Sequence, residues 1–191
     1  MEKIGANQNN EITEYHLDLL LEKLSGPPKE HIIFQNYWAA IGFDRYHQNS
    51  KTEIEFVVDG KSIKAMLSWN SNFSKVTMKE SIDIANHGGV AMAWFLMTII
   101  LGYTYVEQTE IGDGVDYRFM KAEPTDDDLN FLDEYHYVEI SGILEESKTN
   151  TVKSRLKIKH DQINRGGKRD KPSSVIVTLF SHPKTVVEIH K

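Results

Sequence analysis

The first quarter of the chain carries a helical repeat of leucines. Leu17, Leu20, Leu21 and Leu24 are spaced at i, i+3, i+4 and i+7, which is typical of one face of an amphipathic helix. We therefore predict a helix over residues 12–25. The Gly-Pro-Pro sequence that follows would end this helix, because proline cannot continue it and glycine favours turns.

A β-hairpin is predicted next. Asp59-Gly60 is a strong turn signal, and it separates two extended stretches at residues 52–58 and 61–69. Residues 31–48, which precede the hairpin, are rich in aromatic side chains, and their pattern leaves helix and irregular structure open. Together with the leucine helix, these segments form an N-terminal extension over residues 1–75.

The middle of the chain predicts a long apolar helix over residues 78–101. Thr77 to Glu80 has the capping-box pattern of a helix start, and Gly102 suits the C-terminal end. The run from Val90 to Leu101 is apolar on nearly every side, so we expect it in the core. This run is too short to cross a bilayer, and we expect no contact with a membrane.

Strands and one helix alternate in the remaining sequence. Extended apolar patterns predict strands at 103–108, 115–120, 135–144 and 174–180. A basic helix is predicted over 148–164, and a short strand over 185–189 is expected at a sheet edge. From residue 78 the order is helix, three strands, helix, strand. The chain should therefore have an α+β fold with a mixed sheet, whose core spans residues 76–191.

Composition limits the class of protein. The chain has 191 residues, of which 40% are hydrophobic and 26% charged, which is ordinary for a globular domain. It has no cysteine, so disulfides and thiolate metal sites are excluded, and a reducing compartment is suitable. The polar start lacks the apolar segment of a secretion signal, so we expect a cytoplasmic protein.

Charge is distributed unevenly along the chain. The net charge is −6, yet residues 148–191 hold 11 lysines and arginines against three acids, a local charge of +8. This asymmetry suits an anion-binding face on an acidic body, and it equally suits a solvated basic helix and loop. The segment 148–171 is thus a candidate for contact with nucleic acid, and a partner protein is the other candidate. The oligomeric state stays open.

Two carboxylates occur in segments that otherwise suit buried strands. Asp116 lies in Gly112-Asp-Gly-Val-Asp-Tyr117, and Glu139 lies in Val138-Glu-Ile-Ser-Gly142. An ionised carboxylate is costly to bury, so each should lie beside a metal, a cation or a solvent-filled cleft. If they lie on neighbouring strands, they present the oxygen ligands that a divalent metal needs for phosphodiester hydrolysis.

These two motifs, with two others in the same order, resemble the restriction-endonuclease-like nucleases, the PD-(D/E)XK superfamily. Within that fold, the chain resembles a bacterial family of uncharacterised proteins. The other motifs are Tyr103-Thr-Tyr-Val-Glu107 and Arg155-Leu-Lys-Ile-Lys159, and the hairpin end Leu67-Ser-Trp69 also looks like that family. The resemblance implies a restriction-endonuclease-like αβββαβ core in which Asp116 and Glu139 hold Mg²⁺.

The resemblance also implies a lysine two residues after the Glu, where it would position water and stabilise developing charge. Residue 141 is serine, so this lysine is missing. A lysine of the following helix is one replacement. Lys159 with Gln162 on the same helical face is preferred, and Lys157 and Arg118 are the alternatives.

Three functional hypotheses follow. The leading one is a degenerate PD-(D/E)XK-like domain that binds nucleic acid or a partner protein in a bacterial defence or mobile-element context. The first alternative is an active Mg²⁺-dependent nuclease with a relocated lysine. The second is a protein-binding accessory or immunity-type protein. If the resemblance is fortuitous, Asp116 is an ordinary turn acid and Glu139 pairs with a cation across the sheet.

Other candidate residues have simpler explanations. Glu80 could be a further metal ligand, but its capping position explains it fully. His87 on the same helix could bind metal or carry a proton, although a packed histidine is the more common case. The sequence lacks a glycine-rich phosphate loop, a Ser-His-Asp signature and a dinucleotide fingerprint, which disfavours ATP-dependent phosphate transfer and hydride chemistry.

Overall fold

The computed structural model describes residues 12–71, 79–110, 112–125, 135–166 and 170–190. The strands are β1 Thr13–His16, β2 Lys51–Val58, β3 Lys61–Ser68, β4 Tyr105–Gln108, β5 Tyr117–Met120, β6 His136–Ile143, β7 Ser173–Leu179 and β8 Lys184–Ile189. The helices are α1 Leu20–Lys23, α2 Lys29–Asp44, α3 Ser81–Phe95 and α4 Val152–Arg165. A 3₁₀ turn, Leu17–Leu19, precedes α1, and a π-helical turn, Leu96–Ile100, extends α3.

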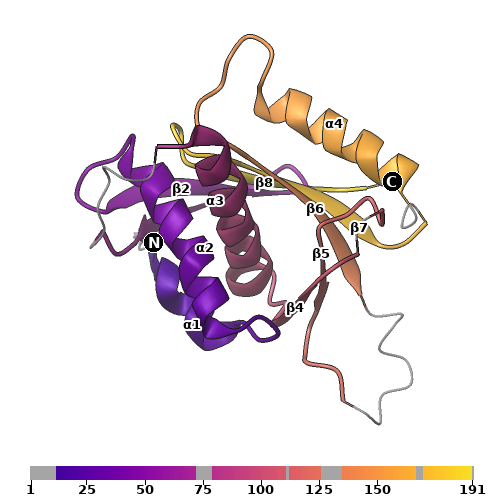
Figure 1. Ribbon diagram of the computed structural model, residues 1–191. Coiled ribbons are helices and arrows are strands. Elements are labelled where there is room, and N and C mark those ends of the chain that lie inside the picture. The colour runs from indigo at the N-terminus through magenta and orange to yellow at the C-terminus, as the bar shows by residue number, and fades with distance from the viewer. Residues whose placement is uncertain (1–11, 72–78, 111, 126–134, 167–169, 191) are drawn as a thin grey trace, which may run out of the picture.

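One mixed eight-stranded sheet organises these elements, in the order β1-β3-β2-β8-β7-β6-β5-β4 (Figure 1). This confirms the predicted α+β class with a mixed sheet. From α3 onward the order is helix, three strands, helix and strand, as the sequence pattern predicts. The strands β4, β5 and β6 form an antiparallel meander, and α4 then crosses over to β7, which pairs parallel with β6.

Helices cover both faces of the sheet. The helices α2 and α3 pack together on one face, and α4 lies across the other (Figure 1). Alternation along β6 explains the division, since Val138 and Ile140 belong to the core under α3, whereas Tyr137 belongs to the core under α4. The strand is therefore buried on both sides, in agreement with its continuous apolar pattern.

Two glycines allow α3 to lie almost directly on β6. A Cβ atom added to Gly142 would lie 1.8 Å from the carbonyl oxygen of Ala85, and one added to Gly89 would lie 2.9 Å from the amide nitrogen of Gly142. Glycine in a helix interior is normally unfavourable. Here a larger residue at Gly89 would collide with β6, so the close packing of α3 on the strand accounts for the glycines in the middle of this helix.

The predicted helix over residues 12–25 is largely wrong. Residues 13–16 form β1, which pairs parallel with β3, and only the short turns from Leu17 to Lys23 are helical. The leucine spacing reflects burial in these turns, where Leu17 and Leu20 enter the core. In residues 12–16 only Tyr15 packs against the core, and residues 13–16 gain backbone hydrogen bonds by pairing with β3.

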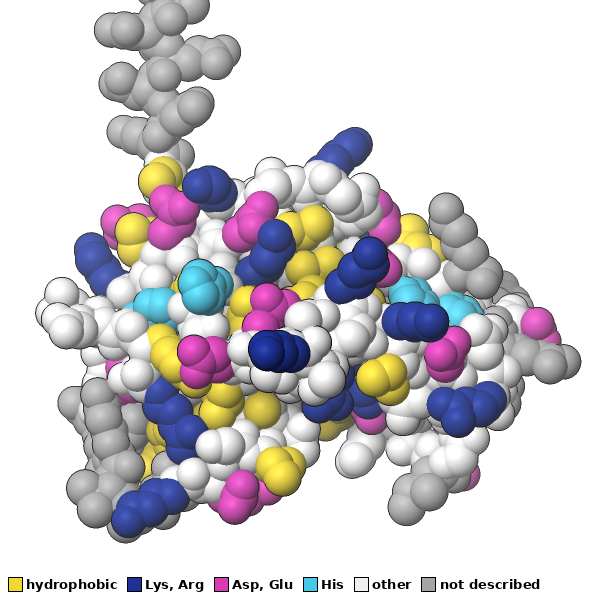
Figure 2. Space-filling model, turned by 90° about the horizontal axis from the view of Figure 1, so that it is seen from above, with side chains coloured by type: hydrophobic (Ala, Val, Ile, Leu, Met, Phe, Trp, Pro, Cys, Tyr) yellow, Lys and Arg dark blue, Asp and Glu magenta, His cyan; other side chains and the backbone are white. Residues whose placement is uncertain are grey.

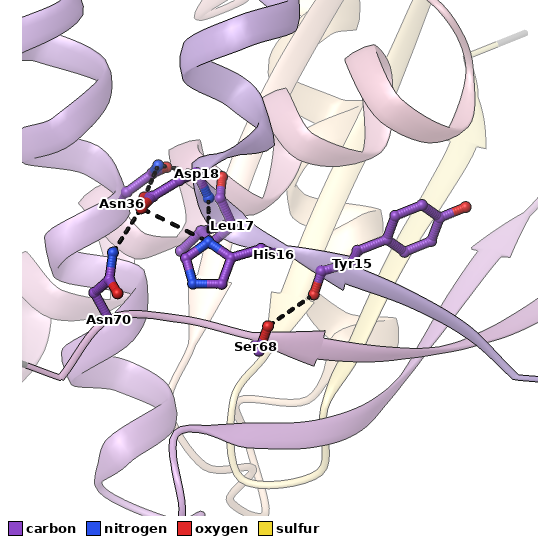
Figure 3. A network of polar contacts seen from close by, with 7 residues as sticks. All are labelled: Tyr15, His16, Leu17, Asp18, Asn36, Ser68 and Asn70. Carbon is purple, nitrogen blue, oxygen red and sulfur yellow. Dashed lines mark hydrogen bonds and ion pairs between the residues drawn. The ribbon is translucent and has the colours of Figure 1, made fainter.

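A polar network holds the end of β1 in place (Figure 3). The Asn36 amide of α2 donates to the Leu17 carbonyl oxygen at 3.2 Å, and the Asn70 amide donates to the Asp18 carboxylate at 2.6 Å. The Ser68 hydroxyl donates to the Tyr15 carbonyl oxygen at 3.1 Å. These contacts join segments far apart in the sequence, so the leucine pattern could not reveal them.

Other boundaries also differ from prediction. The residues predicted as ambiguous at 31–48 lie mostly in α2, and α3 begins at Ser81 rather than at 78; Thr77 lies outside the described residues. The strand expected at a sheet edge, β8, lies between β7 and β2 and joins the N-terminal hairpin to the sheet. The sheet is therefore continuous across the predicted boundary at residue 75. No helix in the described segments has the length and apolar character needed to cross a membrane.

Candidate functional site

The strands β5 and β6 separate at Asp116 and Glu139. Their pairing register begins at Tyr117 and Val138, so both acids lie just beyond the ladder. The Asp116 amide still donates to the Val138 carbonyl oxygen at 2.9 Å, and its carboxylate accepts a hydrogen bond from the Ile140 amide at 2.7 Å. The carboxylate thus replaces the backbone acceptor that β5 no longer offers.

The glycine-rich turn before Asp116 packs against the end of α4. Gly112 and Gly114 have φ angles of +102° and +77°, which side chains rarely adopt. A Cβ atom on Gly114 would lie 2.6 Å from the Cα atom of Gly166, directly after α4. The Gly-x-Gly-x-Asp motif therefore fixes Asp116 and the C-terminal half of α4 beside each other.

Lys159 of α4 reaches the acid of β6. Its ammonium nitrogen lies 2.6 Å from Glu139 Oε1, and the two side chains are 17% and 5% exposed. Lys159, which helical spacing favours over Lys157, therefore lies in direct contact with Glu139. Ser141 itself is buried and carries no charge.

The environment of Glu139 opposes its ionisation. Burial and the neighbouring Asp116 charge raise the pKa of Glu139 to about 7, although the hydrogen bond and charge of Lys159 act in the opposite direction. The stabilisation that Lys159 gives to the ionised form of Glu139 is therefore smaller than the destabilisation caused by burial and by the Asp116 charge. A further positive charge beside Asp116 and Glu139 would relieve this deficit.

Gln162, one helical turn after Lys159, lines the same cavity as the two carboxylates. Its Oε1 atom is buried and has no hydrogen-bond partner among the described residues. It lines a cavity of about 270 Å³ together with Asp116 and Glu139. A buried acceptor without a donor is costly, so a cation or a donor that reached this oxygen would be stabilising.

These oxygens suit a magnesium ion. Mg²⁺ is usually held by one or two carboxylates and keeps several waters, so Asp116, Glu139 and the Gln162 oxygen are a sufficient set. In the described segments, His, Cys, Asp and Glu side chains form no group of three that could hold a metal. The fit therefore depends on two carboxylates and one amide rather than on a cluster of acids.

The other candidate residues lie elsewhere. Lys157 is exposed on α4. The Arg118 guanidinium donates to Glu107 at 2.6 Å and lies over the ring of Tyr135. Glu80 does cap α3, but as the N-cap itself rather than as the last residue of the predicted capping box, and it accepts a hydrogen bond from the Ile82 amide at 3.3 Å.

A second cavity of about 410 Å³ shares Asp116 with the first and is also lined by Lys159. The helices α2 and α3 contribute His31, Gln35, Asn86 and His87 to it. Of these four residues, only His87 was a candidate from the sequence. The sequence analysis did not identify His31, Gln35 or Asn86 as site residues. The one available signal was Gln35-Asn36, a polar pair inside an otherwise apolar and aromatic segment.

The basic C-terminal segment does not form a uniform patch. Figure 2 shows lysines and arginines interspersed with acids over the face that α4 covers. Lys153, Lys157 and Arg165 are exposed on α4, but so is Asp161 on the same helix. Charge on this face is therefore mixed, so it is weaker evidence for a functional surface than the residues beside Asp116 are for a site.

Comparisons of the chain with protein-family models, with curated proteins and with solved structures found no match.

Proposed function

We propose that this protein is a Mg²⁺-dependent nuclease with a restriction-endonuclease-like core. The observation that carries the proposal is the contact of Lys159 with Glu139 at 2.6 Å, beside Asp116, which directly precedes β5. It supports the relocation of the missing lysine from β6 to α4. The α3-β4-β5-β6-α4-β7 order, with its parallel β6 and β7, supports the fold assignment.

Each residue has a distinct role in this proposal. Asp116, Glu139 and Gln162 would hold the magnesium ion, which supplies a nucleophilic water and neutralises charge on the phosphate. The Lys159 ammonium stabilises negative charge that develops on the phosphate oxygens. Glu139 keeps that ammonium in place and must be ionised to bind the metal, so metal affinity should fall as the pH drops below 7.

The test is cleavage of labelled single-stranded DNA, double-stranded DNA and RNA, with Mg²⁺ or Mn²⁺ and with a chelator. We expect metal-dependent cutting, and at least about a hundredfold loss in Asp116→Ala, because even second-shell changes cost 10- to 100-fold in metal sites. Glu107→Gln is the matched control, since this acid lies in another ion pair. No cutting of any substrate with either metal would refute the proposal.

A degenerate domain that binds nucleic acid or a partner protein is the second candidate. The observation that favours it is that both carboxylates already have partners, because Asp116 accepts from Ile140 and Glu139 pairs with Lys159. This candidate expects no cutting. Affinity for DNA that falls steeply with salt would favour a nucleic-acid partner, whereas salt-independent absence of binding would favour a protein.

A further inference from the structure

The 410 Å³ cavity beside Asp116 is lined by three amide side chains from three separate elements. They are Gln35 of α2, Asn86 of α3 and Gln108, the last residue of β4. The volume is within the range of about 300–1,000 Å³ that is typical of small-molecule sites. The nuclease site proposed above uses none of these amides.

Gln35 is the residue of this cavity whose hydrogen bonding is incomplete. The residue is only 2% exposed, and its Nε2 atom forms a hydrogen bond with His31 Nε2 at 2.9 Å. Its Oε1 atom is buried without any hydrogen-bond partner in the described chain. Such an acceptor is costly to leave unsatisfied, so a donor on a bound molecule would remove a penalty that the free protein bears.

The other residues that line the cavity limit which kinds of molecule could bind in it. Asn86 and Gln108 are exposed, and their amides make no hydrogen bond to another described residue, so each offers a donor and an acceptor. The walls include the apolar surfaces of Val90, Tyr117 and Ile140. A fitting ligand therefore has apolar faces and alternating donors and acceptors along its edge.

A heterocyclic base has this combination of properties. Amide side chains are the common partners of base edges, because they present a donor and an acceptor side by side. The position of the cavity agrees with this ligand, since Asp116 and Lys159 line it as well and a phosphate bonded to the same nucleotide would lie toward them. A base reaches such a pocket only when it is unstacked.

We propose that this cavity receives one unpaired nucleobase next to the scissile phosphate, with Gln35 accepting a hydrogen bond from the base edge. This inference rests on the proposed nuclease function, and it names single-stranded nucleic acid as the substrate class. Gln35 and Asn86 are then specificity-determining residues that contact the substrate away from the reacting atoms.

Binding without metal tests the inference separately from cleavage. The probes are a labelled single-stranded oligo(dA) and an abasic oligomer of the same length and charge, measured by fluorescence anisotropy with a chelator present. We expect the base-carrying strand to bind about tenfold more tightly, equivalent to one or two hydrogen bonds. Gln35→Leu and Asn86→Ala should each weaken oligo(dA) binding about fivefold and leave the abasic oligomer unchanged.

Asn164→Ala is the matched control, because Asn164 is an exposed helical amide on α4 that lines a different cavity. We expect it to bind both strands as the wild type does. Thermal unfolding of Gln35→Leu checks its fold, and the exposed Asn86 gives a second variant that does not alter the core.

Equal affinity of the wild type for the two strands would overturn the inference. So would variants at Gln35 and Asn86 that weaken both strands alike. Either result together with metal-dependent cleavage would leave the proposed nuclease function standing. A base-dependent affinity without cleavage on any substrate would instead support the pocket and refute only the nuclease.

Discussion

Two carboxylates of this sheet each form an ion pair, and the surroundings of the two pairs differ in a way that favours one of them as the proposed site. Glu107 of β4 pairs with Arg118 of β5, and Glu139 of β6 pairs with Lys159 of α4. Both have donor–acceptor distances near 2.6 Å. Geometry alone would therefore give them the same importance.

Their surroundings separate them. Burial would raise the pKa of Glu107, but hydrogen bonds from Tyr105 and Arg118, together with the Arg118 charge, hold it below its ordinary value. Tyr135 also donates to Glu107 and stacks on the guanidinium. Glu139 is more deeply buried and faces Asp116 rather than additional donors, so its pKa is raised instead.

The contrast gives a criterion for sites in proteins of this kind. A carboxylate whose oxygens already accept hydrogen bonds from several donors is stable in its ionised form without a further ligand. A buried carboxylate that faces a second one retains a demand for positive charge, which its lysine meets only in part. Strongly perturbed groups of the second type are frequent in active sites.

The largest difference between the two pairs should be seen in cleavage. We expect Lys159→Met to lower kcat at least about a hundredfold, the usual cost of removing a group that stabilises transition-state charge. Lys157→Met is the matched control, because it removes the same charge from an exposed position on the same helix. Steady-state cleavage of DNA with Mg²⁺ at saturating substrate measures kcat for both variants. Equal activity of the two variants would show that Lys159 has no part in the chemistry.

The pH dependence of the free energy of unfolding should have opposite signs for the two carboxylates, Glu139 and Glu107. Folded Glu139 binds its proton more tightly than the unfolded chain does, so the free energy of unfolding should fall as pH rises from 4.5 to about 7. Glu139→Gln should remove this component. Glu107 has a lowered pKa, so its contribution is present above its ordinary value of 4.5 and is lost as pH falls through the folded pKa.

Urea unfolding of the wild type, Glu139→Gln and Glu107→Gln gives the comparison, over a pH range that extends from well below 4.5, where the Glu107 contribution is lost, to above 7. The difference between Glu139→Gln and the wild type should shift in favour of the variant as pH rises. The corresponding difference for Glu107→Gln should shift in favour of the wild type. Parallel curves for the two variants would mean that the carboxylates have similar environments.

Much of this site followed from the sequence. The positions of Asp116 and Glu139 came from charged residues in apolar segments, and helical periodicity singled out Lys159 with Gln162 over Lys157. These inferences were possible because each depends on a short repeat within one strand or helix. The element order from α3 to β7 was accessible for the same reason.

What was missed depends on contacts between distant segments. The pairing of β1 with β3 turned a predicted helix into a strand, and no local pattern in residues 12–16 reports that partner. The second cavity likewise combines α2, α3 and β4, so Gln35, Asn86 and Gln108 carry no common signal along the chain. The amide of Ile140 as the partner of Asp116 became visible only with the separation of β5 and β6.

The smallest effect that we expect is a loss of stability without a loss of activity. Arg118→Met removes the cation of the structural pair, whose side chains are 32% and 27% exposed, so the free energy of unfolding should fall by only about 1 kcal/mol. Cleavage should stay within about twofold of the wild type, an energetic change of about 0.4 kcal/mol. Urea unfolding and the cleavage assay on the same preparation measure both. If Arg118→Met instead reduced cleavage as much as Lys159→Met, the Glu107 pair would belong to the site, because a cation that only supports the sheet has no means of changing kcat at constant stability.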